Sequence, residues 1–209
     1  MSPHPDLVAA LAEAGVRLTP AQEAVVDCYA ALVADRGRSL NLVSAGDLAR
    51  FYDRHLFDSL VAVPLMKWTG TEVVDVGSGA GLPGIPIAIA CPEAHVLLVE
   101  RTRKRVAFMT YAIRALAIGN AEALWMDVRD LARTRGGFAD VVTIRAVAAT
   151  DEALALADGV LRPDGVVLLW QTEQQRAREP TPPGWRASWR PTPSRDGVCR
   201  GIRVCARAG

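Results

Sequence analysis

The chain has 209 residues, a formal net charge of +1 and 50% hydrophobic residues. These values suit one domain with a full-sized core, and they exclude a globally basic nucleic-acid binder, so any RNA surface has to be local. No apolar run reaches the length of a membrane-spanning helix, which argues against a membrane protein.

The N-terminus and the cysteines favour a cytoplasmic protein. No basic leader precedes an apolar core at the N-terminus, so we expect no signal peptide. The cysteines are scattered, and no pair has the spacing of metal ligands; they are Cys28, Cys91, Cys199 and Cys205. We therefore expect reduced thiols and no metal site.

Three helices are expected before the first strand. Residues 5–16 carry apolar side chains near one face, which is typical of a short amphipathic helix. Thr19 and Gln22 have the spacing of a capping box, and the helix that they open runs to about Asp35. Ser44 is a suitable N-cap for the third helix.

The third helix carries the polar residues Arg54, His55 and Asp58 among apolar ones. Two interpretations stay open for this group: a solvated polar face, or the substrate side of a site. A metal site is not expected here, because no second His or Cys lies nearby.

A glycine-rich turn follows the first expected strand. Residues 73–76 form an apolar run typical of a buried strand, and residues 85–90 begin a helix. Gly77, Gly79 and Gly81 lie between them, and glycine lets the backbone take unusual φ values close to a ligand. Strand, turn and helix form the nucleotide-cradling first unit of a doubly wound sheet.

The glycine spacing decides between possible ligands. The dinucleotide fingerprint requires its third glycine where this chain has Leu82. Asp75 precedes the first glycine by two residues, and this pattern resembles motif I of the S-adenosylmethionine-dependent methyltransferases. A carboxylate beside the turn suits the ammonium of that cofactor, whereas a pyrophosphate requires a helix N-terminus. Another nucleotide ligand and a purely structural turn remain as alternatives.

The second expected strand, residues 95–100, ends in Glu100, where doubly wound folds place the acid that receives ribose hydroxyls. Arg103, Lys104 and Arg105 then open a helix, although cations at a helix start oppose its dipole. A phosphate partner and a solvated turn are equally open interpretations of this basic cluster.

Three further strands complete the expected sheet. Residues 121–126 form the third strand, and the segment 127–130 behind it is where such folds hold adenine. Residues 140–147 form the fourth strand, with Arg145 near its carboxyl end, where ligands lie in open α/β sheets. An unpaired arginine is costly to bury among apolar residues, so we expect Arg145 to be functional or ion-paired.

The remaining chain closes the sheet. A helix over residues 151–161 and a turn at 162–165 precede a fifth strand at 166–170, and residues 185–189 and 198–206 suit an antiparallel pair. The expected organisation is an α/β doubly wound sheet domain, residues 69–209, with a helical N-terminal cap, residues 1–68, in the same compact unit.

With these residues identified, the chain resembles the bacterial small-subunit ribosomal RNA guanine-N7 methyltransferases, the RsmG or GidB family. The resemblance spans about residues 5–170. The segments that carry it are Asn41-Leu42-Val43-Ser44, Arg54-His55-Leu56-Phe57-Asp58-Ser59, residues 74–86 with Leu82-Pro83-Gly84-Ile85-Pro86 after the glycines, Lys104-Arg105 and Arg145-Ala146-Val147-Ala148.

The resemblance implies a Rossmann-like class I methyltransferase fold with a helical N-terminal cap, and S-adenosyl-L-methionine as cofactor. It implies methylation of guanine N7 in 16S ribosomal RNA, as naked RNA or as the small ribosomal subunit, by a cytoplasmic, monomeric enzyme. Guanine N7 has a lone pair and no proton to remove, so no general base is expected and catalysis rests on alignment.

The expected site residues fall into three groups. The residues expected at the cofactor are Asp75, Gly77, Gly79, Gly81, Leu82, Glu100, Val128, Arg129 and Arg145. Those expected on the substrate side are Arg54, His55 and Arg145, none of them assigned as the single catalyst, and those expected to contact RNA phosphates are Arg103, Lys104 and Arg105.

Two positions depart from the family pattern. Arg129 stands where the family usually has an acid, and Gln171-Thr172 stands where it has Lys-Gly after the fifth strand. The departures leave open a diverged paralogue that methylates a small molecule. A non-catalytic protein that binds the cofactor or RNA is a further alternative.

Overall fold

The computed structural model describes residues 5–37, 40, 42–193 and 197–209, so Asn41 of the first family segment lies outside the described residues. Its centre is a seven-stranded sheet in the order β3-β2-β1-β4-β5-β7-β6. The strands are β1 (Glu72–Val76), β2 (His95–Glu100), β3 (Ala121–Trp125), β4 (Ala139–Arg145), β5 (Leu161–Thr172), β6 (Trp185–Thr192) and β7 (Arg200–Arg207).

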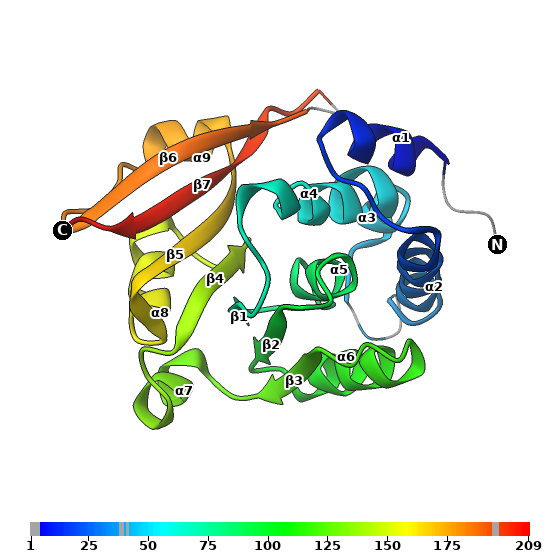
Figure 1. The fold of residues 1–209 in the computed structure, drawn as a ribbon, viewed down its shortest axis with the longest axis horizontal. Helices are drawn as coiled ribbons and strands as arrows, with labels where there is room; N and C mark the ends of the chain where they lie inside the picture. Colours follow the sequence, from blue (N-terminus) through cyan, green and yellow to red (C-terminus); the bar gives the residue numbers. More distant parts are fainter. Residues whose placement is uncertain (1–4, 38–39, 41, 194–196) are drawn as a thin grey trace.

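The first five strands are parallel, and β7 runs antiparallel to both β5 and β6. From β1 the chain moves outward to β2 and β3 and then returns to place β4 on the other side of β1 (Figure 1). The order therefore reverses between β1 and β4, which makes the carboxyl ends of these two strands the expected ligand crevice of the fold.

The helices form two layers, one on each face of the sheet. One hydrophobic core contains buried residues of α1, α2, α4, α5 and α6, and a second contains those of α7 and α8. The helices are α1 (Pro5–Glu13), α2 (Pro20–Arg36), α3 (Ala45–Leu48), a π-helix (Phe51–Leu56), α4 (Phe57–Leu60), a 3-10 turn (Val63–Leu65), α5 (Gly84–Ala90), α6 (Arg103–Ala115), α7 (Val128–Thr134), α8 (Thr150–Asp158) and α9 (Glu173–Arg178).

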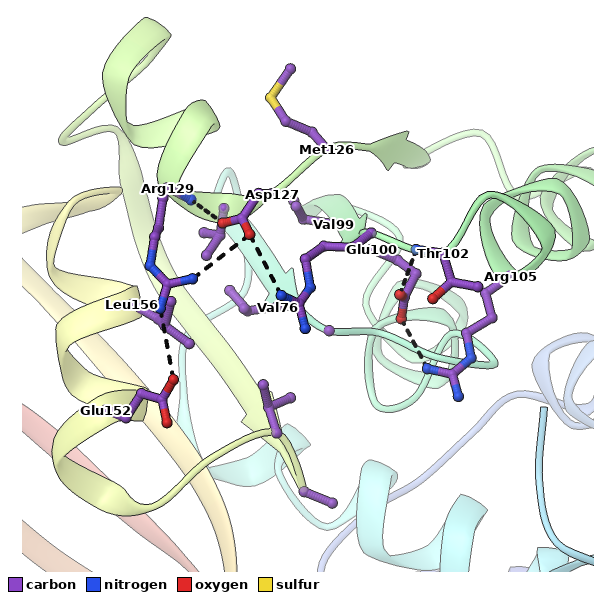
Figure 2. A pocket seen from close by; sticks show the side chains of 15 residues that line it. Val76, Val99, Glu100, Thr102, Arg105, Met126, Asp127, Arg129, Glu152 and Leu156 are labelled. Atoms are coloured by element: carbon purple, nitrogen blue, oxygen red, sulfur yellow. Dashed lines mark hydrogen bonds and ion pairs between the residues drawn. The ribbon is translucent and has the colours of Figure 1, made fainter. Parts of the chain in front are cut away.

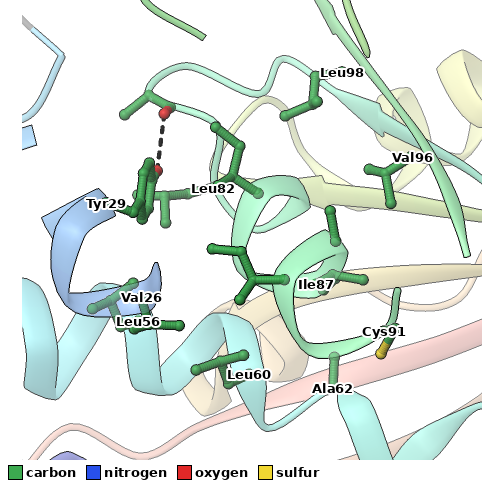
Figure 3. Close-up of a cluster of buried hydrophobic side chains, with 14 of the residues drawn as sticks. Val26, Tyr29, Leu56, Leu60, Ala62, Leu82, Ile87, Cys91, Val96 and Leu98 are labelled. Carbon is green, nitrogen blue, oxygen red and sulfur yellow. Dashed lines mark hydrogen bonds between the residues drawn. The ribbon is translucent and has the colours of Figure 1, made fainter. Parts of the chain in front are cut away.

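The second N-terminal helix, α2, begins as the sequence predicts and packs behind the glycine turn. The Thr19 side chain and Gln22 form the reciprocal capping box. Tyr29 of the same helix is completely buried, and its hydroxyl donates a 2.9 Å hydrogen bond to the carbonyl of Ala80 (Figure 3). Burial raises the pKa of Tyr29, so the hydroxyl stays protonated as a donor.

The prediction of one continuous third helix is wrong. The segment divides into α3, the π-helix and α4, and the backbone N–H of Phe57 bonds to the carbonyl of Tyr52, which widens the turn. Arg54 and His55 lie in this widened segment. Short π segments inside helices occur often at functional sites, because the extra residue displaces side chains from the regular helical face.

Two details of the C-terminal half differ from the expected elements. β5 already pairs with β4 at Leu161, and residues 162–165 bulge out before pairing resumes at Val166, so the expected turn interrupts a longer strand. The polar segment after β5 forms α9, with a second capping box made by Thr172 and Gln175. Among the described residues, no helix has the length and hydrophobicity needed to cross a membrane.

Candidate functional site

The glycine turn lies at the switch point between β1 and β4. Gly77, Gly79 and Gly81 have φ values of 68°, 60° and 100°, in the left-handed region that glycine tolerates best. A Cβ on Gly77 would approach Val147 Cγ2 to 2.6 Å, so this position also requires glycine for space. The three expected glycines therefore shape an open turn at the carboxyl edge of the sheet.

Asp75 supports the turn from below. It is 0% exposed, and its Oδ1 accepts a 2.7 Å hydrogen bond from Thr143 Oγ1. Its Oδ2 accepts a 3.1 Å bond from the backbone N–H of Gly84, at the start of α5. Burial raises the pKa of Asp75 to about 6, although these hydrogen bonds oppose the shift. Asp75 lines none of the three cavities described below, in contrast to the residues that face them. Direct contact of its carboxylate with a cationic ligand therefore stays a prediction that this buried position does not support.

Glu100 holds the other side of the turn at the end of β2. Its Oε2 accepts from the backbone N–H of Gly79 at 3.1 Å, and its Oε1 accepts from the N–H of Thr102 at 2.8 Å. Arg105 lies 3.5 Å from the same carboxylate (Figure 2). Burial raises the pKa of Glu100, but the bonds from Thr102 and Gly79 and the charge of Arg105 outweigh it, so the net pKa is lowered. The side chain stays ionised.

Glu100 lines a cavity of about 290 Å³, here called the Glu100 cavity. Of the expected residues it also contains Gly77, Val128, Arg129 and Arg105. Asp127 also lines it and belongs to the segment expected at the adenine, residues 127–130. The residues that sequence reasoning missed as cavity lining are Val76, Val99, Arg101, Thr102, Met126, Ala146, Val147, Glu152 and Leu156. Met126 follows directly on a strand end, which is a usable signal. Glu152 and Leu156 come from α8 and carry no local signal.

Arg129 spans one side of the Glu100 cavity. Its guanidinium lies 3.7 Å from Asp127 and 3.7 Å from Glu152, and so joins α7 to α8 (Figure 2). Its backbone N–H donates to Asp127 Oδ1 at 2.8 Å, as part of the N-cap of α7. The basic side chain at this position therefore has acidic partners within the chain.

A second space, the glycine-turn cavity, has a volume of about 440 Å³. The expected residues that line it are Gly77, Gly79, Leu82, His55, Arg105 and Arg145. It shares Gly77, Arg105 and Ala146 with the Glu100 cavity. The two spaces therefore lie side by side around the turn. Gly81 lines neither of them; a Cβ there would meet Ile85 Cδ1 at 2.4 Å, so its role is packing.

Ala146 marks the meeting point of three cavities. It lines the Glu100 cavity, the glycine-turn cavity and a third space of about 260 Å³, here called the Trp170 cavity. Its φ of 54° is unusual for a residue with a side chain. Backbone strain of this kind clusters at ligand sites, where surrounding structure holds it in place.

Arg145 and His55 come together at this meeting point. Arg145 Nη2 lies 2.6 Å from His55 Nδ1, and Nη1 donates to the His55 carbonyl at 3.2 Å and to Ser59 Oγ at 3.3 Å. Burial lowers the pKa of Arg145, while the negative charge of Asp58 opposes the shift. The buried guanidinium of Arg145 is therefore satisfied by hydrogen bonds to the helical segment that carries His55, and a function for Arg145 stays a prediction.

Arg54 and Asp58 line the Trp170 cavity with Arg145, Trp170 and Arg200, so the structure brings together the polar group of the third predicted helix and the end of β4. The Trp170 indole N–H donates to the Asp58 carbonyl at 2.6 Å. Gln171 follows Trp170, but its side-chain amide donates to Thr150 Oγ1 at 2.7 Å in a buried network. The side-chain amide of Gln171 is therefore already bonded within the protein.

The basic cluster at the start of α6 divides. Arg105 contacts Glu100 and lines both the Glu100 cavity and the glycine-turn cavity. Arg103 and Lys104 are exposed, and the Arg103 guanidinium lies 5.5 Å from the ring centroid of Trp125.

Among the described residues, no group of three His, Cys, Asp or Glu side chains could hold a metal ion.

A comparison with family models matches residues 22–180 to GidB, described as rRNA small subunit methyltransferase G. Proteins named Ribosomal RNA small subunit methyltransferase G are similar in sequence. One from Cupriavidus necator is 37% identical over 78% of this chain and 73% of its own length. One from Sorangium cellulosum is 34% identical over 86% of this chain and 75% of its own length. One from Mycobacterium leprae is 39% identical over 74% of this chain, and the chain covers 60% of that relative's length.

Solved structures share the fold at low sequence identity. The [4+2]-cyclase SpnF has a TM-score of 0.60 and 15% identity, over 76% of this chain and 82% of that chain. TrmN from Thermus thermophilus has a TM-score of 0.57 and 21% sequence identity, over 74% of this chain and 50% of that chain. P. horikoshii TYW2, solved with MeSAdo, has a TM-score of 0.55 and 19% sequence identity, over 72% of this chain and 61% of that chain. At these identities the likeness shows a common fold.

Proposed function

Because this chain belongs to the GidB family, described as rRNA small subunit methyltransferase G, we propose that it transfers a methyl group from S-adenosyl-L-methionine to N7 of a guanine in 16S ribosomal RNA. The Rossmann-like class I methyltransferase fold, with helices before the first strand, is established. The chain spans only about 60% of the length of its Mycobacterium leprae relatives, so its activity and substrate are part of this proposal.

The observation that carries the proposal is the pair of adjoining cavities around the glycine turn. An elongated ligand with a nucleoside at one end and an amino acid at the other requires two connected spaces. The Glu100 cavity and the glycine-turn cavity share Gly77 and Ala146, so one molecule can extend through both. The absence of a Cβ at Gly77 keeps the shared wall open.

In this proposal the Glu100 cavity holds the adenosine part. The ionised carboxylate of Glu100 receives ribose hydroxyls, and Val128 and Arg129 lie on the adenine side. Gly77, Gly79 and Leu82 line the space for the methionine part. Asp75 and Gly81 act indirectly, since Asp75 holds the start of α5 and Gly81 packs on Ile85. When bound, the cofactor supplies an electrophilic methyl group on a sulfonium.

The Trp170 cavity is the proposed entry for the target nucleotide. It meets the other two at Ala146, and its wall contains the cations Arg54, Arg145 and Arg200, which suit a phosphate-bearing substrate. His55 lines the neighbouring glycine-turn cavity and is held by Arg145. N7 carries no proton to remove, so these residues serve to orient the base and exclude water.

The exposed cations Arg103 and Lys104, with Arg105 behind them, are proposed contacts for RNA phosphates beyond the target nucleotide. The proposed partner is 16S ribosomal RNA or the small ribosomal subunit, and the protein is proposed to act as a monomer in the cytoplasm. The shared core of α1, α2, α4 and α5 with the sheet supports a helical cap, residues 1–68, that forms one compact unit with residues 69–209.

The test uses small ribosomal subunits from a strain that lacks the gene, incubated with the protein and cofactor labelled in its methyl group. Label in 16S RNA, at a position that is cleaved by chemistry specific for N7-methylguanine, is the expected result. Label only in a small metabolite would favour a diverged paralogue. Cofactor binding by calorimetry without any transfer would show that the protein is not a methyltransferase under these conditions and would overturn the proposal.

A further inference from the structure

The outer face of α6 carries cations and no acids. The described helix contains Arg103, Lys104, Arg105 and Arg114, and its sequence has neither Asp nor Glu. The first three cations lie in its first turn, where they oppose the helix dipole, and the N-cap Thr102 makes no side-chain capping bond. Helix stability therefore does not account for these residues.

Arg105 has a partner for its charge in Glu100, 3.5 Å away, but Arg103 and Lys104 have no such partner among the described residues. Neither of them forms an ion pair with another described residue, and both are exposed. A pair of like charges at the start of a helix, without an ion-pair partner among the described residues, is favourable where a polyanion supplies the counter-charge.

An exposed tryptophan lies beside this cluster. Trp125 ends β3, at the edge of the sheet. It is 57% exposed, the largest value among the exposed large hydrophobic residues in the described part of the chain. Its indole N–H donates to the Arg101 carbonyl at 2.8 Å, and the Arg103 guanidinium lies 5.5 Å from its ring centroid. The ring is thus held in place from two sides while much of its surface faces solvent.

The same arrangement recurs further along the helix. Tyr111 is 41% exposed, and the Arg36 guanidinium lies 4.1 Å from its ring centroid. Residues 103, 104, 107, 111 and 114 follow a helical spacing and are all exposed, so both aromatic rings and the cations belong to one side of the molecule. This surface, defined by Arg103, Lys104, Tyr111, Arg114 and Trp125, is called the α6 strip.

We propose that the α6 strip binds a single-stranded segment of RNA, with one base stacked on Trp125 and the adjoining phosphates on Arg103 and Lys104. Held aromatic rings interleaved with cations are the recurring platform for single-stranded nucleic acid, because every base has a face that stacks. Trp125 immediately precedes Met126 of the Glu100 cavity, so the strip begins at the rim of the proposed cofactor site. The inference rests on the proposed function, since it names how that site holds the substrate RNA.

The test measures the Kd of the full chain for a fluorescein-labelled single-stranded RNA, and separately the KM for small subunits. Trp125→Ala is expected to raise both about tenfold, the loss typical of one base stack, while Trp125→Phe stays near wild type. Cofactor affinity and kcat are expected to stay within about twofold, because Trp125 lines none of the three cavities. An unchanged RNA Kd for Trp125→Ala would overturn the stacking assignment.

The charges are tested through salt dependence. Arg103→Gln with Lys104→Gln is expected to reduce the slope of log Kobs against log salt by about 1.4, or about 0.7 for each phosphate contact. The matched control is Arg133→Gln with Arg135→Gln, which removes two cations at the end of α7. Equal slopes for the two double variants would overturn the phosphate assignment. If wild type neither binds nor methylates RNA, the proposed function fails instead, which is a different outcome.

Discussion

The side chains of Arg145 and His55 are 90 residues apart in sequence and 2.6 Å apart in space, between Nη2 and Nδ1. A guanidinium has only donors, so Nδ1 must accept, and the ring proton of the neutral imidazole lies on Nε2. Arg145 therefore fixes both the orientation and the tautomer of His55, and joins the end of β4 to the π-helix.

Replacement of Arg145 tests this relationship. Arg145→Ala removes hydrogen bonds to the His55 ring, the His55 carbonyl and Ser59, and we expect the free energy of unfolding to fall by about 1–3 kcal/mol. Methyl transfer to small subunits is expected to fall at least tenfold, because the π-helix loses its anchor at the site. Arg133→Ala removes only an exposed ion pair and is expected to change stability by about 1 kcal/mol or less. Equal denaturant midpoints for the two variants would contradict the anchoring role.

Glu100→Ala tests the ribose assignment by calorimetry with the cofactor. The substitution removes the carboxylate that accepts from Gly79 and Thr102, and the Kd is expected to rise about tenfold or more, the loss of a charge-assisted hydrogen bond. Glu122→Ala removes an exposed acid from the neighbouring β3 and is expected to leave the Kd unchanged. Unchanged binding by Glu100→Ala would remove Glu100 from the cofactor site.

The buried carboxyl of Asp75 predicts a specific pH dependence. Its pKa is raised from 3.8 to about 6 by burial, so the folded state binds a proton more tightly than the unfolded state. The stability from this group is fully present below about pH 4 and is lost as the pH rises through about 6. Asp75→Asn removes this titration, so the stability of the variant relative to wild type is expected to rise by about 1–3 kcal/mol between pH 4 and pH 7.5. Urea unfolding of both proteins across this pH range measures the difference in stability. A difference that does not change with pH would contradict the prediction.

Asp75→Asn also separates two roles for this residue. The amide can keep contact with both Thr143 Oγ1 and the Gly84 N–H, because a hydroxyl can accept as well as donate. If Asp75 acts by holding α5, cofactor affinity stays within a few-fold of wild type. A loss of a hundredfold or more, with the fold intact by circular dichroism, would restore the direct contact with the ammonium.

Two glycines of the turn are expected to differ in their tolerance of a methyl group. Gly79→Ala meets no atom closer than 3.9 Å, so only the left-handed backbone opposes it, at about 1–2 kcal/mol. Gly81→Ala adds a clash with Ile85 Cδ1 at 2.4 Å in a packed core, so it is expected to destabilise by about 1–3 kcal/mol more. Thermal unfolding gives the order, and a reversed order would contradict the packing role of Gly81.

Several features of this protein follow from short stretches of sequence. The apolar run before Gly77 and the missing side chains within the turn require a buried strand that bends close to a ligand, whatever surrounds them. The capping box of Thr19 and Gln22 is likewise local, because both partners lie within one helical turn. Glu100 could be placed because its distance from the first glycine is set by one helix and one strand.

Other features depend on partners that are distant in the chain. The sequence suggested a ligand contact for Asp75, and only the positions of Thr143 and Gly84 show that its oxygens are used inside the protein. The pairing of Arg145 with His55 and the exposure of Trp125 were equally invisible. Periodicity reports which face of an element is buried, but which residues meet across elements depends on strand order and helix packing. The sequence by itself therefore determined the fold class and the turn, whereas the tertiary structure decided which side chains line the cavities and which are bonded inside the protein.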